Sequence, residues 1–254
     1  MSKVKPATLV KVNHAEAVYR QRSNPSSSNL DLMSHGSYHI NPDVSSDRIC
    51  HPDQELLLFA IDGKIKIEVK GQEYVMEHYD VLYIPVNTPY VISNIGEEES
   101  FTLAFKAFAE NRHPVYFAEW KKVSADESRI RHLDGKDVFL MFDVSEGADK
   151  LIAGYTIYEP HTRAYPAHNH TDQEEIYLFS KGRGAMEVYE EEKNKTFVTS
   201  VDTMDSVTIP LLNYHPVFSQ DEELHFIWCI AGERYWVGDK NTDFMKGDSA
   251  ELTT

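Results

Sequence analysis

The stretch that decides the fold is "AHNHTDQEE", from Ala167 to Glu175, taken together with "CHPDQELL", from Cys50 to Leu57. Both stretches contain the tripeptide Asp-Gln-Glu, and both lead into an apolar, strand-like segment that ends at a glycine. The later stretch has two histidines and a second glutamate, whereas the earlier one has a single histidine. Two copies of one motif in one chain indicate an internal duplication.

The repeat extends outward from this motif. Asp172 lies over Asp53 at an offset of 119 residues (172 − 53), and the same offset places Gly182 over Gly63. Farther on, "VTIPLLNYHPV" (207–217) matches "LYIPVNTPYVI" (82–92) at an offset of 125 (210 − 85). The second copy has therefore gained six residues. We expect them in the charged hairpin "YEEEKNKTF" (Tyr189–Phe197), because a polar surface turn tolerates insertion.

Strand patterns dominate both copies. The segment "KIKIEVK" (Lys64–Lys70) alternates apolar and polar residues, which is typical of a strand with one buried face. Asp-Gly and Lys-Gly pairs mark turns between strand-length runs, and little of the chain has a helical pattern. We therefore predict an all-β fold in which the duplication builds two small antiparallel barrels, or jelly rolls.

The predicted organisation has five parts. They are an N-terminal arm (1–45) with one strand near Ser37–Ile40, a first barrel (46–120), a linker with shared strands (121–150), a second barrel (151–240) and a tail (241–254).

Composition limits the partners. The 254 residues include 25 basic and 41 acidic ones, for a net charge of −16, which argues against a nucleic-acid partner. A few local cations can still bind an anionic small molecule. Two cysteines are too few for a disulfide scaffold, and neither a signal peptide nor an apolar run of membrane-spanning length is present. We expect a soluble cytoplasmic protein without a membrane partner.

The second copy has the residues of a metal site. His168 and His170 stand two residues apart, so both point to one face of an extended segment; Glu175 follows, and His215 lies beyond a hairpin. Three imidazoles and one carboxylate can bind a divalent first-row metal and leave positions open to substrate. An isolated His-x-His would be a surface accident. The whole spacing, His-x-His-x4-Glu-x6-Gly and then Pro-x4-His, reproduces the metal motif of the cupin superfamily. We predict one divalent metal per chain.

The first copy lacks most of these ligands. The counterparts of the four ligands, in the same order, are Ile49, His51, Leu56 and Tyr90. One ligand of four is retained, and a barrel filled with apolar and aromatic side chains is a packed core. We predict that the first barrel is structural.

The chain resembles the bicupin family that contains 5-keto-4-deoxyuronate isomerase and 5-deoxyglucuronate isomerase. "PAHNHTDQEEIYLF" is similar to the segment in which those enzymes bind zinc, and "IPLLNYHPV" and "LHFIWCIAGERYW" resemble their closing strands. The resemblance covers residues 55–236. Met204 and Leu212 stand where cupin motifs usually have glycine.

The resemblance implies a metal-dependent aldose–ketose isomerase. Its metal would be zinc, with manganese, iron or nickel as alternatives. Its substrate would be a sugar with an anion at C6, either a deoxyuronate (5-deoxyglucuronate or 5-keto-4-deoxyuronate) or a sulfonated hexose such as sulfoquinovose. The family resemblance also implies a homo-oligomer, a dimer or a hexamer.

Such a reaction needs a base near the exposed carbon and a cation for the substrate anion. Glu174 adjoins Glu175, but strand alternation points it the other way. The catalytic candidates are Tyr177, which shares the face of Glu175, and Glu187 and His225 on neighbouring strands. Tyr177 could equally be a core tyrosine. The substrate-binding candidates are Arg163, Arg234 and Lys181, with Arg183 as a further cation, and each could equally be a surface charge.

Other functions fit the same ligands. An iron-dependent cupin dioxygenase would use the same four residues, and a non-catalytic sugar-binding cupin would need a degraded site or a DNA-binding appendage. An epimerase or a lyase acting on a related sugar acid would have nearly the same sequence.

Overall fold

The computed structural model describes residues 5, 7–10, 19–143, 145–163, 167–191 and 194–232. Within these ranges most of the chain is β-strand. The first half contains β2 (Tyr19–Ser23), α1 (Pro25–Ser28), β3 (Met33–Ile40), β4 (Gln54–Asp62), β5 (Ile65–Val69), β6 (Gln72–Met76), β7 (Val81–Ile84), β8 (Tyr90–Asn94), β9 (Ser100–Phe108) and β10 (Tyr116–Ala118).

A short connection and a second set of strands follow. They are α2 (Trp120–Val123), the 3-10 helix η1 (Glu127–Arg129), β11 (Ile130–Leu133), β12 (Lys136–Phe142), β13 (Leu151–Tyr158), β14 (Gln173–Lys181), β15 (Gly184–Glu191), β16 (Asn194–Val201), β17 (Ser206–Ile209), β18 (Val217–Ser219) and β19 (Leu224–Gly232). One more strand, β1 (Thr8–Val10), precedes all of these.

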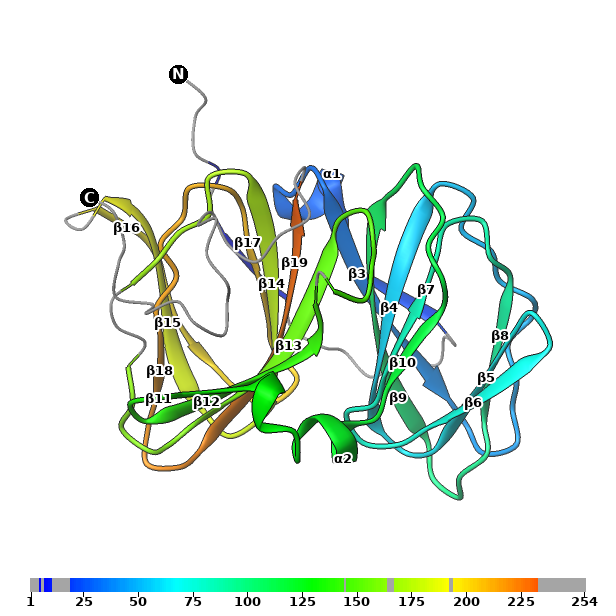
Figure 1. The fold of residues 1–254 in the computed structure, drawn as a ribbon. Helices are drawn as coiled ribbons and strands as arrows, with labels where there is room; N and C mark the ends of the chain where they lie inside the picture. The colour runs from blue at the N-terminus through cyan, green and yellow to red at the C-terminus, as the bar shows by residue number, and fades with distance from the viewer. Residues whose placement is uncertain are drawn as a thin grey trace.

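The strands form two barrels that lie side by side (Figure 1). The first barrel combines the sheet β10-β7-β4-β9-β3-β2 with the smaller sheet β6-β5-β8. The second combines β1-β17-β14-β19-β13-β12-β11 with β16-β15-β18. Equivalent strands occupy equivalent places, and the paired strands are antiparallel. The predicted all-β fold of two antiparallel barrels from an internal duplication is confirmed.

The six extra residues of the second copy lie in the predicted hairpin. Gly184, where β15 begins, comes 119 residues after Ile65 of β5 (184 − 65), whereas Val201, where β16 ends, comes 125 after Met76 of β6 (201 − 76). The offset therefore changes between the two ends of one β-hairpin. A longer hairpin at the barrel surface leaves the core strands in register.

Burial explains why the strands differ in their sequence patterns. In β4 seven successive residues, Glu55 to Ile61, are buried, because one face lines the first barrel and the other packs against the second. Strands covered on both faces are continuously apolar. In β5 burial alternates, with Ile65, Ile67 and Val69 inside, as the alternation of "KIKIEVK" predicts.

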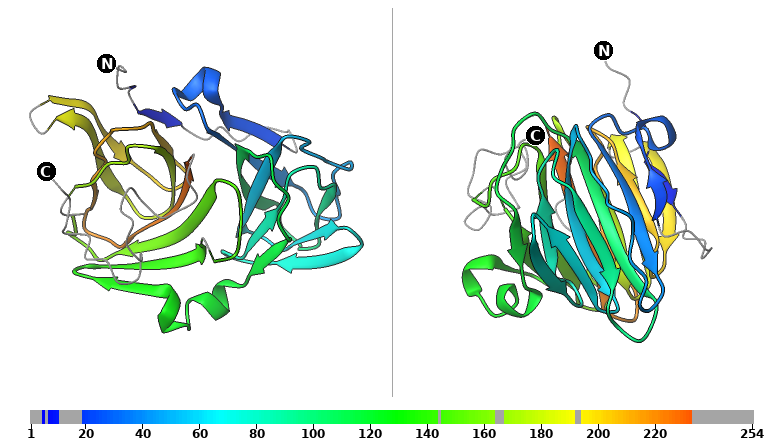
Figure 2. Two further views of the ribbon diagram at one scale, coloured as in Figure 1. Left: turned by 45° about the horizontal axis from the view of Figure 1, so that its top comes forward. Right: turned by 90° about the vertical axis from the view of Figure 1, so that its right-hand side faces the viewer.

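The predicted arm does not stand apart from the barrels. Strand β3 pairs with β9 over its whole length and β2 pairs with β3, so residues 19–40 belong to the first barrel. Strand β1 instead pairs with β17 and takes the place in the second sheet that β10 takes in the first (Figure 2). The hydrophobic pattern of so short a strand does not say which edge it will pair with.

The predicted linker also contributes to a barrel. Strands β11 and β12 extend the second sheet beside β13, and α2 and η1 make the connection. The predicted tail (241–254) lies outside the described residues. None of the helices in the described part of the chain is long and apolar enough to cross a membrane.

Three clusters of buried side chains hold the molecule together. One fills each barrel, and the third lies between the two large sheets, where Leu57 and Phe105 of the first meet Leu178 and Ile227 of the second. Each large sheet therefore has an inner face toward its own barrel and an outer face toward the other barrel. This distinction determines which side chains can reach the predicted metal site.

Candidate metal centre

The structure brings the four predicted ligands together. His168 and His170 lie in the loop before β14, Glu175 is the third residue of β14, and His215 lies in the loop between β17 and β18. One ligand atom from each of the four lies within 4.8 Å of the others. His170, Glu175 and His215 are 6%, 3% and 2% exposed, and His168 is partly buried. Residues up to 47 positions apart (215 − 168) thus form one buried cluster.

Two hydrogen bonds hold the loops in place. The N–H of Leu212 donates to the carbonyl of His170 at 2.7 Å, which ties the histidine loop to the loop that carries His215. The side chain of Asn213 donates to the carbonyl of Pro210 at 3.1 Å.

Leu212 has a φ of 65° and Met204 a φ of 73°, both in the left-handed region that favours glycine. These are the two positions where cupin motifs usually have glycine.

The donor set fits a divalent cation. Nδ1–H of His215 donates to the carbonyl of Asn213 at 2.8 Å, so the Nε2 of that ring carries a lone pair. This Nε2 lies 2.9 Å from Oε2 of Glu175, and Nε2 of His170 lies 3.2 Å from the same oxygen. A cation between this nitrogen and the carboxylate oxygen, either a shared proton or a metal ion, would satisfy both acceptors.

The protonation states suit metal binding. Burial alone would raise the pKa of Glu175, but the close imidazoles of His170 and then His215 lower it to about 2, so this carboxyl is ionised at neutral pH. Burial, followed by the neighbouring His215 and His170, lowers the pKa of His168 well below its usual value. His168 is therefore neutral and offers a lone pair to a metal at neutral pH.

Tyr177 points into the second barrel, as strand alternation predicts. Its ring centroid lies 5.7 Å from that of His215, and the ring packs among the side chains of the barrel core. Burial, and then the charge of Glu175, raises the pKa of Tyr177 well above 10. Its hydroxyl stays protonated and can donate a hydrogen bond to a bound molecule.

Glu174 points to the opposite face of β14. Its carboxylate accepts hydrogen bonds from the backbone N–H groups of Asp31, Leu32 and Met33, at 2.5, 2.8 and 3.3 Å. These residues immediately precede or begin β3 of the first barrel. Glu174 therefore joins the two barrels and does not face the histidine cluster, as its position in the strand predicts.

The structure does not bring Glu187 or Arg163 to the cluster. Glu187 lies between Met186 and Val188 of β15, which both point into the barrel core, so Glu187 points outward. Its Oε2 is 3.8 Å from Nη2 of Arg163, whose guanidinium lies 5.0 Å from the ring of Phe218. These two candidates for base and anion binder form an ion pair on the outside of the barrel.

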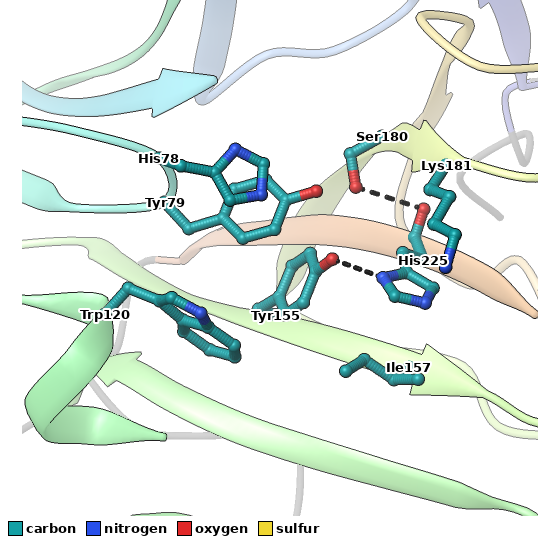
Figure 3. Close-up of a pocket in the computed structure, with 8 residues that line it drawn as sticks. All are labelled: His78, Tyr79, Trp120, Tyr155, Ile157, Ser180, Lys181 and His225. Atoms are coloured by element: carbon teal, nitrogen blue, oxygen red, sulfur yellow. Dashed lines mark hydrogen bonds between the residues drawn. The ribbon is translucent and has the colours of Figure 1, made fainter. Parts of the chain in front are cut away.

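His225 and Lys181 lie in a different cavity, of about 430 Å³, on the outer face of the second sheet. Figure 3 shows its eight lining residues, His78, Tyr79, Trp120, Tyr155, Ile157, Ser180, Lys181 and His225. The side chains on either side of His225 in β19 explain its placement, because Leu224 and Phe226 point into the barrel.

Within this cavity His225 and Lys181 each form a hydrogen bond. The hydroxyl of Tyr155 lies 2.6 Å from Nδ1 of His225, and Nζ of Lys181 donates to Glu223 at 2.9 Å. Of the remaining predicted cations, Arg183 pairs with Glu222 and is mostly exposed, and Arg234 lies outside the described residues.

The sequence analysis missed one cation on the inner face of the second barrel. Lys136, the first residue of β12, lies two and four positions before Val138 and Leu140, which belong to the core of the second barrel. The pattern "KDVFLMF" (136–142) contains this alternation. Residues 121–150 were expected to be a linker with shared strands, so this face was not assigned to either barrel.

The counterpart positions in the first barrel form a packed core. Leu56 and Tyr90 are each 1% exposed, and Ile49 packs against the same cluster. The hydroxyl of Tyr90 lies 2.7 Å from that of Tyr38 and 3.2 Å from Nε2 of His51. Within the described ranges, the second barrel holds the one group of three or more His, Cys, Asp or Glu residues that could bind a metal.

Two antiparallel barrels from a duplication, one with a His-x-His, Glu and His cluster on its inner face, define a bicupin. Solved structures agree on the fold. An IolB-like protein from Salmonella typhimurium superimposes with a TM-score of 0.76, at 16% identity, over 94% of this chain and 100% of that one. An oxalate decarboxylase from Lactobacillus farciminis, in a formate complex, gives 0.72 at 12% identity, over 94% and 89%.

Sequence comparison gives the family. The model of the KduI/IolB family matches residues 8–246, so the chain belongs to this family. A protein of Bacillus licheniformis named 4-deoxy-L-threo-5-hexosulose-uronate ketol-isomerase is 29% identical over 185 residues, which cover 68% of this chain and 65% of that protein. A protein of the same name from Bacillus pumilus is 26% identical over 215 residues, 77% of this chain and 72% of that protein.

Proposed function

We propose that this chain is a metal-dependent aldose–ketose isomerase that acts on a sugar with an anion at C6, and on a deoxyuronate first. The observation that carries the proposal is the buried cluster of three imidazoles and one ionised carboxylate on the inner face of the second barrel. Membership of the KduI/IolB family and the names of the two Bacillus relatives support the choice of reaction and substrate.

His168, His170, Glu175 and His215 would hold one divalent metal, and nitrogen and oxygen donors suit zinc, with manganese, iron and nickel as alternatives. The bound metal supplies a positive charge that stabilises the negative charge developing on substrate oxygens during proton transfer. We assign to the protonated hydroxyl of Tyr177 a hydrogen bond to a substrate oxygen. We assign no base role to Glu187 or His225, because both point away from this cluster.

The proposal can be tested by NMR on metal-loaded protein in deuterated water without oxygen. The panel contains 4-deoxy-L-threo-5-hexosulose uronate, 5-deoxyglucuronate and sulfoquinovose, and His170→Ala is the metal-site control. We expect interconversion of aldose and ketose, often with deuterium entering beside the carbonyl, for a deoxyuronate and not for the control.

Three other outcomes would contradict the proposed reaction. Turnover that needs oxygen would indicate a dioxygenase, and release of a smaller product would indicate a lyase. Binding of a sugar without any turnover would indicate a sugar-binding cupin. Turnover of sulfoquinovose alone would keep the reaction and change the substrate.

We also propose a homo-oligomer, a dimer or a hexamer, in the cytoplasm. Two unpaired cysteines, exposed Cys50 and buried Cys229, suit a reducing compartment. Exposed apolar side chains such as Val198, 63% exposed, and Phe108, 48% exposed, offer surface to bury between subunits. Light scattering that gives the mass of one chain at micromolar concentration would contradict the oligomer.

A further inference from the structure

Lys136 lies on the inner face of the second barrel, near the rim of its sheet. It begins β12, where it is opposite Leu133 of β11 and Tyr158 of β13. Tyr158 is 3% exposed and belongs to the barrel core, as do Val138 and Leu140 on the same face of β12. The side chain of Lys136 is partly buried, and its Nζ lies 5.4 Å from the centroid of the Tyr158 ring.

This ammonium has no carboxylate partner among the residues that the structure describes. The charged neighbour that acts on it is a like charge, Arg131, on the same face of β11. Burial, and to a smaller extent Arg131, lowers the pKa of Lys136 to about 8, so the group is still mostly protonated at neutral pH. A partly buried cation without a carboxylate partner is unusual in a chain with a net charge of −16.

The other candidate cations differ in this respect. Arg163, Lys181 and Arg183 each lie close to a carboxylate, at 3.8, 2.9 and 3.3 Å, and each lies outside the second barrel. Their charges are already compensated. Lys136 combines an inward position with an uncompensated charge.

A continuous set of ring contacts joins Lys136 to the ligand cluster. The Tyr158 ring contacts Phe226 at 5.3 Å, Phe226 contacts Tyr177 at 4.7 Å, and Tyr177 contacts His215 at 5.7 Å, centroid to centroid. The Lys136 charge also contributes to the electrostatic environment of His168. The ammonium and the ligand cluster therefore border the same inner face, separated by aromatic side chains.

We propose that Lys136 binds the anionic end of the substrate, the C6 carboxylate of a sugar acid whose reacting end lies at the His168, His170, Glu175 and His215 cluster. The role in the reaction rests on the proposed function, whereas the binding of a carboxylate does not. A charge-assisted hydrogen bond from Lys136 would orient the sugar along the barrel and favour acids over neutral sugars.

Three variants make the test. Lys136→Met keeps the length of the side chain over Tyr158 and removes the charge, and Lys136→Arg keeps the charge. Lys66→Met removes a lysine from β5 of the first barrel and is the matched control. Metal content and melting temperature are measured for all three, and we expect metal content to stay at the wild-type level.

The first experiment needs no turnover. D-glucuronate and D-glucose, which differ at C6, are titrated into cobalt-loaded protein and followed by the visible absorption of the cobalt. We expect wild type and Lys66→Met to prefer D-glucuronate about tenfold or more, Lys136→Met to lose that preference, and Lys136→Arg to retain most of it. Absence of a preference in wild type, or an unchanged preference in Lys136→Met, would overturn the proposal even if the protein is not an isomerase.

The second experiment uses steady-state turnover of 4-deoxy-L-threo-5-hexosulose uronate. We expect Lys136→Met to raise KM by about ten- to a hundredfold with kcat changed by less than about threefold, and Lys136→Arg to restore most of the loss. A fall in kcat at constant KM that Lys136→Arg does not restore would assign Lys136 to proton transfer and overturn the binding role. If wild type binds D-glucuronate through Lys136 but turns over no sugar, the isomerase proposal fails and the binding proposal stands.

Discussion

The two barrels share their backbone plan and one pair of glutamates, yet differ at three of the four positions that could bind a metal. Glu55 of the first barrel accepts hydrogen bonds from the N–H groups of Asp149, Lys150 and Leu151, at 2.9, 2.8 and 2.9 Å. Glu174, its counterpart 119 residues later (174 − 55), accepts three from the residues at the start of β3. Each barrel thus holds the start of one strand of the other, β3 in the first barrel and β13 in the second.

This comparison explains the repeated Asp-Gln-Glu. Its glutamate, Glu55 or Glu174, forms the joint between the barrels, by which we mean the hydrogen bonds from these two carboxylates to the other barrel. The next position faces the barrel interior, where the first copy has Leu56 and the second has Glu175. Because neighbouring residues of a strand point to opposite faces, one position can be retained while the next changes. The joint and the metal site are therefore separable, and substitutions can test this.

The largest expected effect is a difference between substitutions inside the second barrel and inside the first. His170→Ala should lower metal content from about one per chain to near zero and turnover by at least about a hundredfold, because it removes a ligand. The counterpart His51→Ala should leave metal content and turnover within about twofold. Elemental analysis and the isomerase assay measure both. A metal ion bound in the first barrel, or a loss of metal in His51→Ala, would break the comparison.

The next effect tests the joint. Glu55→Gln and Glu174→Gln should each lower the free energy of unfolding by about 2–3 kcal/mol. An amide accepts fewer hydrogen bonds than a carboxylate, and its NH2 group would face the backbone N–H groups that now donate to the carboxylate. Urea unfolding measures the loss, and exposed Glu68→Gln is the control. Metal content should be unchanged in Glu174→Gln. Unequal losses in the two variants would show that the joint is not reciprocal.

A smaller effect concerns an asymmetry of the joint. His35 is fully buried on β3 and lies 2.9 Å from the hydroxyl of Ser206 in the second barrel, whereas the counterpart of His35 in β13 is Ala153. Burial, and then Arg22, lowers the pKa of His35 to about 3. The unfolded chain therefore binds a proton that the folded one does not, and stability should fall as the pH drops from about 6.5 toward 3, by at most about 1.4 kcal/mol per pH unit.

Urea unfolding of metal-free protein at pH 7 and pH 5 measures this effect. In His35→Gln, the loss of stability between the two pH values should be about 2 kcal/mol smaller than in wild type. An equal loss in both proteins would show that His35 does not contribute to acid sensitivity.

The smallest effect compares two matching turns. Leu212 has a φ of 65° and its counterpart Asn87 a φ of 50°. Leucine is strained in this region and asparagine tolerates it, so Leu212→Gly should stabilise the protein by about 1 kcal/mol and Asn87→Gly by much less. For a chain of this size the first change corresponds to about 2–4 °C in melting temperature. A destabilised Leu212→Gly would mean that the packing of the leucine side chain outweighs the strain.

Much of the fold follows from local pattern. Alternation in "KIKIEVK" and the two offsets, 119 and 125, predicted the barrel strands, the duplication and the position of the longer hairpin, because side-chain period and glycine or proline landmarks are local properties. The predicted arm contributes β1, β2 and β3 to the two large sheets, and the predicted linker with shared strands contributes β11 and β12. Strand β1 pairs with β17, 200 residues away in the sequence (208 − 8), and such edge pairing depends on which partner is available in three dimensions. Strands β11, β12 and β13 instead pair in sequence order.

The site divides in the same way. By itself the sequence determined the four residues gathered in the second barrel, through the spacing of their motif. It also determined the inward direction of Tyr177 and the outward direction of Glu174, because successive side chains of a strand take opposite faces. Only the tertiary structure decided that Glu187, His225, Arg163 and Lys181 point away from that cluster and that Lys136 points toward the same interior. The inner face of a barrel is defined by how the sheet closes, and closure is a property of strands brought together from the whole chain.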